Sequence, residues 1–283
     1  MPLRPARAAV AVMVVLAALA TACSAAGSRP APGPAGSGSG GPAKVRVPAA
    51  NVGFDYQLGG AYPPSETVRA VSRDRGEKPV GGLYNICYVN AFQTQPGEAV
   101  TWWRKHHPDL LLRNDDGDLI VDEDWDEPLL DISTPAKRQA LMDVVGPWID
   151  GCATAGYDAV EPDNLDSYER SGGRLTRRHA AAFARLLAAR AHRRHLAIAQ
   201  KNTAGLLPQH GDIGFDFAVV EECGRYDECG EFSDAYDARI FDVEYVKKDF
   251  TAACRAWGAE LSLTLRDREV GPAGTDGHVH QSC

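Results

Sequence analysis

Short apolar runs alternate with longer, helix-like stretches from about residue 50 to the end of the chain. This alternation is typical of a parallel sheet whose strands are connected by helices. Eight such runs predict a closed (β/α)8 TIM barrel, an α/β fold formed by a single domain. The predicted strands are residues 52–57, 82–90, 128–132, 158–163, 196–202, 215–221, 239–245 and 260–266.

The segments between the strands contain three further signals. Between the fourth and fifth strands, apolar residues recur at helical spacing opposite a polar face, which predicts a helix around residues 175–191. Thr134-Pro135 predicts a helix start with proline in the first turn. Residues 114–117, Asn-Asp-Asp-Gly, predict a small hairpin before the third strand.

An open, doubly wound sheet also fits this order of elements. Such a fold would normally carry a glycine-rich phosphate-binding loop after its first strand. Here residues 55–62 read Asp-Tyr-Gln-Leu-Gly-Gly-Ala-Tyr, and their two adjacent glycines do not form the spaced fingerprint. The barrel is therefore the favoured prediction.

The N-terminal end has the composition of a targeting segment. Residues 1–22 contain two arginines, no acid and an apolar core, which predicts a secretory signal. The junction before Cys23 resembles a bacterial lipoprotein signal, which implies acylation of Cys23; ordinary signal cleavage nearby is the alternative. Residues 23–43 are rich in Ala, Gly, Ser and Pro and predict a flexible linker. Residues 44–283 remain as one domain, extracellular or held at the cell surface.

Charge and cysteine content narrow the class of protein. The formal net charge is −8, and removal of the two signal arginines makes it more negative. This argues against nucleic acid and polyanionic sugars as partners and fits a cationic polymer. We expect a monomer that uses no cofactor and touches a membrane only through a lipid anchor.

Six cysteines besides Cys23 predict disulfides in an exported chain. Cys223 and Cys229 enclose a short loop and form the best-supported pair. Spacing alone does not fix the others, for which Cys87–Cys152 and Cys254–Cys283 are the suggested pairings. A zinc site built from the tail residues His278, His280 and Cys283 is an alternative, although structural zinc normally takes four protein ligands.

Polar residues follow most predicted strands at their carboxyl ends, where barrels build their active sites. Carboxylates there can bind a metal or cleave a glycosidic bond. Residues 163–166 superficially resemble a calcium loop but lack the glycine and terminal glutamate of an EF-hand. No serine, cysteine or histidine has a comparable setting, so a Ser-His-Asp arrangement has little support.

Glycoside cleavage requires two carboxyl groups, one that protonates the leaving oxygen and one that attacks or activates water. Asp163 ends the fourth predicted strand and Glu221 ends the sixth, so we expect them to face each other across the mouth. Glu161, Asp166 and Glu222 could fill the same roles or merely bind loop amides. Strand alternation allows only one of Glu221 and Glu222 to line the cavity.

Four segments resemble glycoside hydrolase family 114, the endo-α-1,4-polygalactosaminidases. These segments are residues 55–60, 158–166, 219–229 and 243–245. The resemblance covers most of residues 50–270 and implies a (β/α)8 barrel that cuts α-1,4-linked galactosamine polymers, free or N-acetylated, with retention. It places the catalytic aspartate on Asp163 and the glutamate on Glu221. Glu161 departs from the family's usual aspartate, and the 114–124 hairpin has no place in the pattern.

We predict Asp163 as nucleophile and Glu221 as acid/base, with reversed roles as the alternative. The remaining mouth residues would bind the amino sugar. They are Asp55, Gln57, Tyr88, Asp131, Glu161, Asn164, Asp166, Lys201, Asn202, Glu244 and Tyr245. Further acids near the mouth would attract a cationic polymer. A surface carbohydrate-binding protein without turnover is the alternative function; a metal-dependent deacetylase or phosphoesterase lacks the expected histidine ligands.

Overall fold

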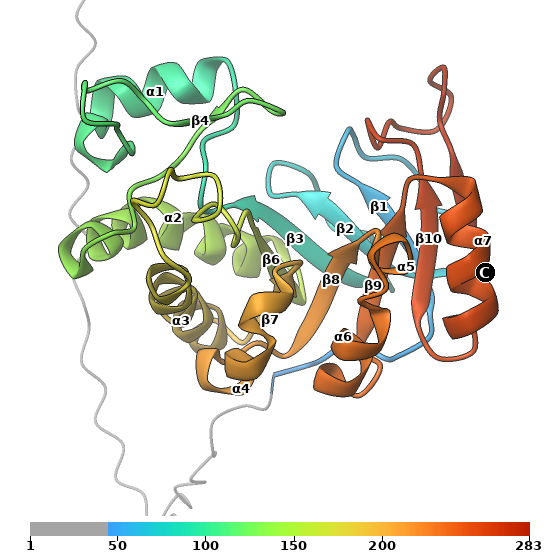
Figure 1. Cartoon of the computed structure of the whole chain (residues 1–283). Coiled ribbons are helices and arrows are strands. Elements are labelled where there is room, and N and C mark those ends of the chain that lie inside the picture. Colours follow the sequence, from blue (N-terminus) through green and yellow to red (C-terminus); the bar gives the residue numbers. More distant parts are fainter. Residues whose placement is uncertain (1–44) are drawn as a thin grey trace, which may run out of the picture. The chain divides into compact units, whose positions relative to one another are not determined.

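The computed structural model describes residues 45–283, so the predicted signal, Cys23 and most of the linker lie outside the described residues. One nine-stranded sheet runs in the order β1-β2-β3-β6-β7-β8-β9-β10-β11, and its neighbours are parallel except for β10 and β11 (Figure 1). The strands are β1 Gly53–Gln57, β2 Val68–Asp74, β3 Tyr84–Asn90, β6 Ala159–Asp163, β7 Ala197–Lys201, β8 Phe217–Glu221, β9 Ile240–Glu244, β10 Ser262–Arg266 and β11 His280–Ser282.

The sheet curls into a barrel whose seam lies between β1 and β10. Side chains and loops bridge this seam: the Val52 N–H donates to Ser262 Oγ (2.9 Å), and the Gly59 N–H donates to the Val270 carbonyl (3.2 Å). A fully buried ion pair between Arg266 and Asp55 (3.3 Å) crosses it as well. The predicted TIM-barrel fold is confirmed.

One predicted strand is wrong and one barrel strand was missed. Residues 128–132 are not in the barrel: only Glu127–Pro128 (β5) forms a strand, paired with Val121–Asp122 (β4) in a small antiparallel sheet. The run is apolar because Leu129 and Leu130 are fully buried. The missing strand is β2, whose sequence VRAVSRD has no continuous apolar run. The other seven predicted strands are confirmed.

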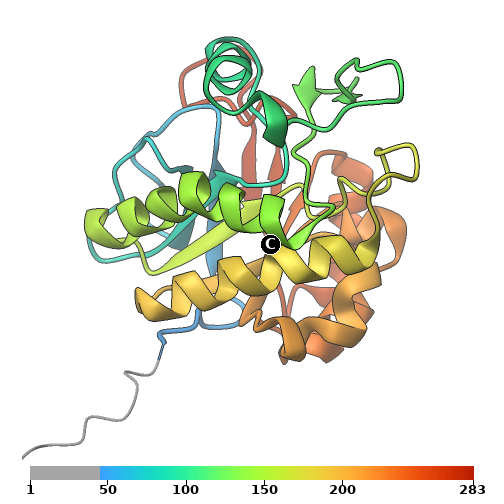
Figure 2. The same ribbon diagram turned by 90° about the vertical axis from the view of Figure 1, so that its left-hand side faces the viewer.

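The helices cover the barrel unevenly. Residues 58–67 and 75–83 connect β1 to β2 and β2 to β3 without a helix. The helices are α1 Glu98–His106, α2 Pro135–Ala155, α3 Arg177–Arg193, α4 His210–Ile213, α5 Cys223–Tyr226, α6 Cys229–Tyr236 and α7 Lys247–Trp257, with short 3-10 helices at Pro108–Leu110 and Ala204–Gln209. Figure 2 shows α2 and α3 side by side on one flank.

Local signals account for two of these helices and for the hairpin. Thr134 caps α2, because its hydroxyl accepts a hydrogen bond from the Lys137 N–H (3.2 Å), and α3 covers the predicted periodic segment. In the hairpin, Gly117 has a φ of 88° and its N–H donates to the Asn114 carbonyl (3.1 Å). Glycine tolerates this left-handed conformation without steric cost.

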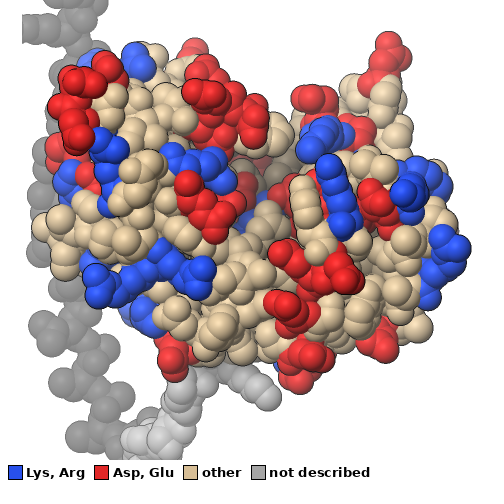
Figure 3. Space-filling view, viewed as in Figure 1, with Lys and Arg blue, Asp and Glu red and all other residues tan. Residues whose placement is uncertain are grey.

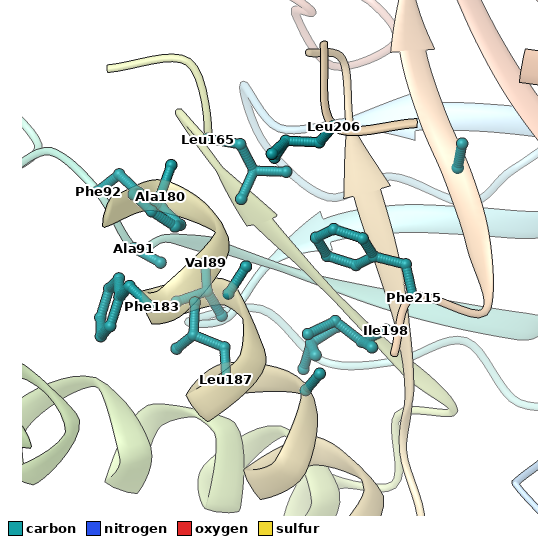
Figure 4. Packing of buried hydrophobic residues seen from close by; sticks show 14 of the residues in the cluster. Val89, Ala91, Phe92, Leu165, Ala180, Phe183, Leu187, Ile198, Leu206 and Phe215 are labelled. Atoms are coloured by element: carbon teal, nitrogen blue, oxygen red, sulfur yellow. The ribbon is translucent and has the colours of Figure 1, made fainter. Parts of the chain in front are cut away.

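The core has an outer and an inner layer. Outside the sheet, Phe183 and Leu187 of α3 pack near Val89 and Ile198, as Figure 4 shows. Inside the barrel, aromatic residues pack together; the ring centroids of Phe54 and Phe241 lie 4.6 Å apart. Toward the carboxyl ends of the strands the inward residues become polar. This change creates the floor of the site.

Three disulfides stabilise the loops and the tail. They are Cys87–Cys152, Cys223–Cys229 and Cys254–Cys283, so all the suggested pairings are confirmed. The zinc alternative for the tail is wrong, because Cys283 is bonded to Cys254. Within residues 45–283 no helix has the length and apolar character needed to cross a membrane.

Candidate active site

A cavity of about 390 Å³ opens at the carboxyl ends of the strands. Figure 3 shows the surface hollowed near its upper middle, with Asp and Glu on the rim. Side chains from the strand ends form its floor and loop residues its walls. The lining includes Tyr56, Tyr88, Asp122, Asp124, Trp125, Glu127, Asp163, Asn164, Asp166, Arg170, Lys201, Asn202, Glu221, Tyr245 and Arg268.

Lys201 at the end of β7 is the centre of the floor. Its side chain is 2% exposed, and its ammonium Nζ lies 3.2 Å from Asp163 Oδ1 and 3.1 Å from Glu221 Oε2. A third carboxylate, Glu161, lies 3.3 Å from the same atom. Burial alone lowers the pKa of a lysine, but here the three negative charges outweigh it and hold the Lys201 pKa well above its usual value. The ammonium therefore stays charged.

Asp163 is held in its ionised form. Burial raises its pKa, but the Lys201 charge and hydrogen bonds from the Tyr88 hydroxyl (2.7 Å) and the Asn164 backbone outweigh burial, so the net shift is downward. The side chain remains 17% exposed to the cavity. Asp163 combines an available oxygen with a stabilised negative charge, the properties that a carboxylate nucleophile needs.

Glu221 ends β8 and is more open, with its side chain 28% exposed. Tyr245 donates a hydrogen bond to Oε1, and the Asn202 side-chain amide donates one to Oε2 (3.1 Å). Asn202 also accepts a bond from the Glu221 N–H (2.7 Å), which fixes the backbone of the strand end. The next residue, Glu222, turns away in a left-handed conformation (φ 59°). The carboxyl group of Glu221 is thereby fixed at the edge of the cavity.

Glu161 lies below this pair and is fully buried. The Tyr56 hydroxyl (2.8 Å) and the Ser72 hydroxyl (2.6 Å) donate to its two oxygens. Burial raises the pKa of Glu161 despite the nearby Lys201 charge. Because no oxygen of Glu161 reaches the open cavity, it can orient Lys201 and Tyr56 but cannot touch a sugar ring.

The rim contains two linked polar groups. Arg170 makes two bonds to Asp166 (2.9 Å each) and an ion pair with Asp122 (2.8 Å). Asn90 and Asn164 donate to Glu127 Oε2 (2.9 and 3.4 Å). Burial raises the pKa of Glu127 to about 7. The charge of the rim therefore changes close to neutral pH.

The position between Asp163 and Glu221, where a cation would balance their charges, is taken by the Lys201 ammonium. Across residues 45–283 no group of three or more His, Cys, Asp or Glu side chains is arranged to hold a metal ion. The floor is thus a pair of partly open carboxylates on one buried ammonium.

Comparison with known proteins identifies the family to which the chain belongs. The family model described as glycoside-hydrolase family GH114 matches residues 37–283. The chain belongs to family GH114. It is therefore a glycoside hydrolase. No match was found among the curated proteins.

Two solved structures have the same barrel as this GH114 chain. The crystal structure of Aspergillus fumigatus Ega3 in complex with galactosamine has a TM-score of 0.66 and 23% identity, and the match covers 85% of this chain and 100% of Ega3. The glycoside hydrolase domain of PelA from Pseudomonas aeruginosa has a TM-score of 0.54 and 19% identity, with coverage of 83% and 98%. At these identities the likeness concerns the fold.

Most of the predicted site residues of this GH114 domain come together at the cavity. Tyr88, Asn164, Asp166, Lys201, Asn202 and Tyr245 line it with Asp163 and Glu221, and Glu161 lies beneath them. Sequence reasoning missed Tyr56, Ser72 and Arg170. Tyr56 lies between Asp55 and Gln57, the two residues of β1 that the sequence predicts as substrate-binding, and Ser72 belongs to β2, which has no continuous apolar run.

Besides the buried Glu161, four predicted residues lie outside the cavity. Asp55 and Gln57 are fully buried and point to the opposite side of β1 from Tyr56; Asp55 pairs with Arg266 and accepts a bond from Gln57 (2.8 Å). Asp131 accepts bonds from Ser133 (2.9 Å, backbone) and Lys137 at the start of α2. Glu244 is also fully buried and binds the Gly224 N–H (2.7 Å). We do not assign these four to substrate binding.

Proposed function

We propose that the protein is an endo-acting hydrolase of α-1,4-linked galactosamine or N-acetylgalactosamine polysaccharide, with Asp163 as nucleophile and Glu221 as acid/base. The observation that carries the proposal is the meeting of both carboxylates on Lys201 Nζ at the open end of the barrel. The galactosamine bound to Ega3, a structure with the same fold, supports an amino sugar as the unit recognised.

The geometry is compatible with a retaining mechanism. Asp163 Oδ1 and Glu221 Oε2 contact the same nitrogen at 3.2 and 3.1 Å, so these two nearest oxygens lie at most about 6.3 Å apart, a limit that includes the ~5–5.5 Å separation of carboxyl groups in retaining enzymes. Glu221 would enter this step in its protonated form. Asp163 would attack the anomeric carbon while the Glu221 carboxyl group gives its proton to the leaving oxygen. Glu221, now deprotonated, would then activate the water that hydrolyses the glycosyl-enzyme.

Neighbouring side chains stabilise the charges and fix the orientation of the two carboxyl groups during the reaction. Lys201 compensates the charge of Glu221 after the bond to Asp163 has neutralised the aspartate. Tyr245 and Asn202 hold Glu221 toward the leaving oxygen. The acids of the rim would attract the ammonium groups of a partly deacetylated polymer.

The N-terminal residues complete the proposal. We infer that residues 1–22 direct export, that Cys23 is lipid-anchored and that residues 23–43 tether a monomeric domain formed by residues 44–283. The three disulfides support an oxidising compartment, since such bonds persist outside the cytosol. The enzyme would then act outside the cell or at its surface.

Product analysis by mass spectrometry tests this function. We expect the purified protein to release short oligosaccharides from partly acetylated α-1,4-galactosaminogalactan. Asp163→Asn and Glu221→Gln should each lower the rate by about 100- to 10,000-fold, because each removes an essential carboxyl group. Asp143→Asn and Glu66→Gln, at exposed positions, are the matched controls.

The outcomes separate the alternatives. Retention of the anomeric configuration in the first product, measured by proton NMR, supports the covalent route, whereas inversion would contradict the assigned role of Asp163. Binding of the polymer without any cleavage by the wild-type protein would favour the non-catalytic carbohydrate-binding alternative.

A further inference from the structure

A second cavity, of about 270 Å³, lies beside the catalytic one. Its walls come from the segment after β3 and from α1 and α2, and Gln95 lines both cavities. Three tryptophans contribute to the lining: Trp102, Trp103 and Trp148. Trp103 is packed into the protein (2% exposed), but Trp102 is 41% exposed. An exposed indole in a polar-edged cavity is a typical recognition surface for a ligand with apolar faces.

Two buried polar atoms in this lining have no hydrogen-bond partner among the described residues. They are Gln93 Oε1 and Thr94 Oγ1, and each residue is 1% exposed. The Gln93 amide nitrogen donates to Asp122 (3.1 Å), which fixes the amide and leaves its oxygen unpaired. Leaving a buried polar group unpaired costs about 1–3 kcal/mol, so a ligand that paired with these two atoms would recover this free energy on binding.

The charge of the second cavity differs from that of the catalytic cavity. Acids such as Asp122, Asp124 and Asp166 line the catalytic cavity. The second cavity has no acid in its lining, and its one charged side chain is Arg75, whose guanidinium lies 4.3 Å from the centre of the Trp148 ring. A cationic sugar unit would be repelled there, whereas a neutral unit would not.

We propose that this cavity is a distal subsite for an uncharged, N-acetylated unit of the polymer. A pyranose ring would pack on Trp102. After a small rotation of the two buried side chains toward the cavity, Gln93 Oε1 would accept a bond from a hydroxyl or acetamido N–H, and the Thr94 hydroxyl would donate to the acetamido oxygen. The inference rests on the proposed function and extends it. The enzyme would select polymers in which an acetylated unit lies at a fixed distance from a cationic unit at Asp163 and Glu221.

Kinetics on two polymers test the subsite. The substrates are galactosaminogalactan with about half of its units acetylated and the fully deacetylated polymer. For Trp102→Ala and Thr94→Val we expect kcat/KM on the acetylated polymer to fall about three- to tenfold through a higher KM, as loss of one aromatic contact or one hydrogen bond predicts, with a smaller loss on the deacetylated polymer. Tyr226→Ala is the control, because Tyr226 is an exposed aromatic that lines neither cavity.

Isothermal titration calorimetry with an N-acetylgalactosamine oligosaccharide gives a readout that needs neither turnover nor the Trp102 indole. Weaker binding by Trp102→Ala and Thr94→Val, with Tyr226→Ala unchanged, supports the subsite even if no polymer is cleaved, in which case the proposed function alone fails. Normal cleavage with no change of KM or binding in either variant overturns the subsite. An equal loss on both polymers overturns its preference for acetylated units.

Discussion

Two clusters of carboxyl groups lie near the carboxyl ends of neighbouring strands, one inside the barrel and one outside it. Inside, Asp163, Glu221 and Glu161 surround the Lys201 ammonium. Outside, Asp242 and Glu244 of β9 are both fully buried beneath α5. Asp242 accepts a bond from the Cys223 N–H (3.1 Å) and Glu244 one from the Gly224 N–H (2.7 Å). Both clusters position the segment around Glu221, but only the first contains a cation.

The presence of a cation determines how each cluster holds its protons. Asp163 has a lowered pKa because the Lys201 charge and hydrogen bonds outweigh burial. Burial and the neighbouring Glu244 instead raise the Asp242 pKa well above its usual value. Within residues 45–283, Asp242 Oδ2 and Glu244 Oε2 have no hydrogen-bond partner. One proton shared between the two oxygens would give each of them a partner. The first cluster can perform chemistry as an anion, and the second can only support the backbone.

Without the Lys201 charge, the carboxyl groups of the first cluster should hold protons as those of the second cluster do. We expect Lys201→Met to lower kcat/KM about 100- to 1,000-fold, as for loss of other preorganised charges in active sites, and to destabilise the fold by about 3–5 kcal/mol. The remaining carboxyl groups must then take up protons, so the acid limb of the kcat/KM profile should move to higher pH. Urea unfolding and the pH dependence of cleavage provide these measurements.

Lys248→Met is the matched control, since Lys248 is exposed. An unchanged acid limb in Lys201→Met, together with lost activity, would show that Lys201 binds substrate and does not set the ionisation of Asp163. If Lys201→Met were as stable as the wild type, the Lys201 ammonium would not be the group that compensates the negative charges of the cavity floor.

In the second cluster, replacing a carboxyl group by a neutral amide should stabilise the fold, whereas loss of the Lys201 charge should destabilise it. The pKa of Asp242 is higher in the folded than in the unfolded protein. Its contribution to stability is therefore fully present below the unfolded-state pKa of about 3.9 and is lost as pH rises toward the folded-state pKa. Asp242→Asn keeps the acceptor for the Cys223 N–H and removes the ionisable group. We expect it to be more stable than the wild type at pH 8 by about 1–3 kcal/mol, with a flatter pH dependence.

Urea unfolding between pH 5 and 9, with the disulfides intact, measures this effect. Asp143→Asn, at an exposed position of α2, should follow the wild-type curve. If Asp242→Asn is less stable at every pH with the wild-type slope, the pair is held by a charged hydrogen bond and the assignment of a shared proton is wrong.

The sequence predicts the fold where burial alone explains the pattern. Seven barrel strands are apolar because both of their faces are covered. The pattern fails at β2, where Arg69 is exposed and Ser72 and Arg73 are buried with polar partners. It fails again at Leu129 and Leu130, which are buried by loops outside the barrel. An apolar run shows that a segment is buried, but it does not show whether the barrel or a loop outside it buries the segment.

The site shows the same limit. Asp163 and Glu221 are predictable because strand ends converge at the mouth of a barrel. The role of Asp55 is not, because its partner Arg266 is distant in the chain and the pairing depends on how the seam closes. With Asp55 facing the seam, strand alternation turns Tyr56 inward, where its hydroxyl contacts Lys201 (2.9 Å).

The smallest expected effect lies at the rim of the catalytic cavity. Burial raises the pKa of Glu127 to about 7, so this side chain gains its negative charge as pH rises through neutrality. The wild-type KM for a deacetylated, cationic polymer should then contain a decrease of about two- to fivefold centred near pH 7, since one charge contributes up to about 1 kcal/mol in a water-filled cleft. Glu127→Gln keeps an oxygen for Asn90 and should remove this step.

The uncharged, fully acetylated polymer is the matched control for this last effect. Its KM should not depend on the charge of Glu127, because no ammonium group is present to be attracted. A step near pH 7 that persists in Glu127→Gln would instead belong to another group, such as the amines of the substrate. The comparison of the two polymers therefore separates the rim carboxyl group from the Lys201 cluster, whose ammonium keeps its charge over the same pH range.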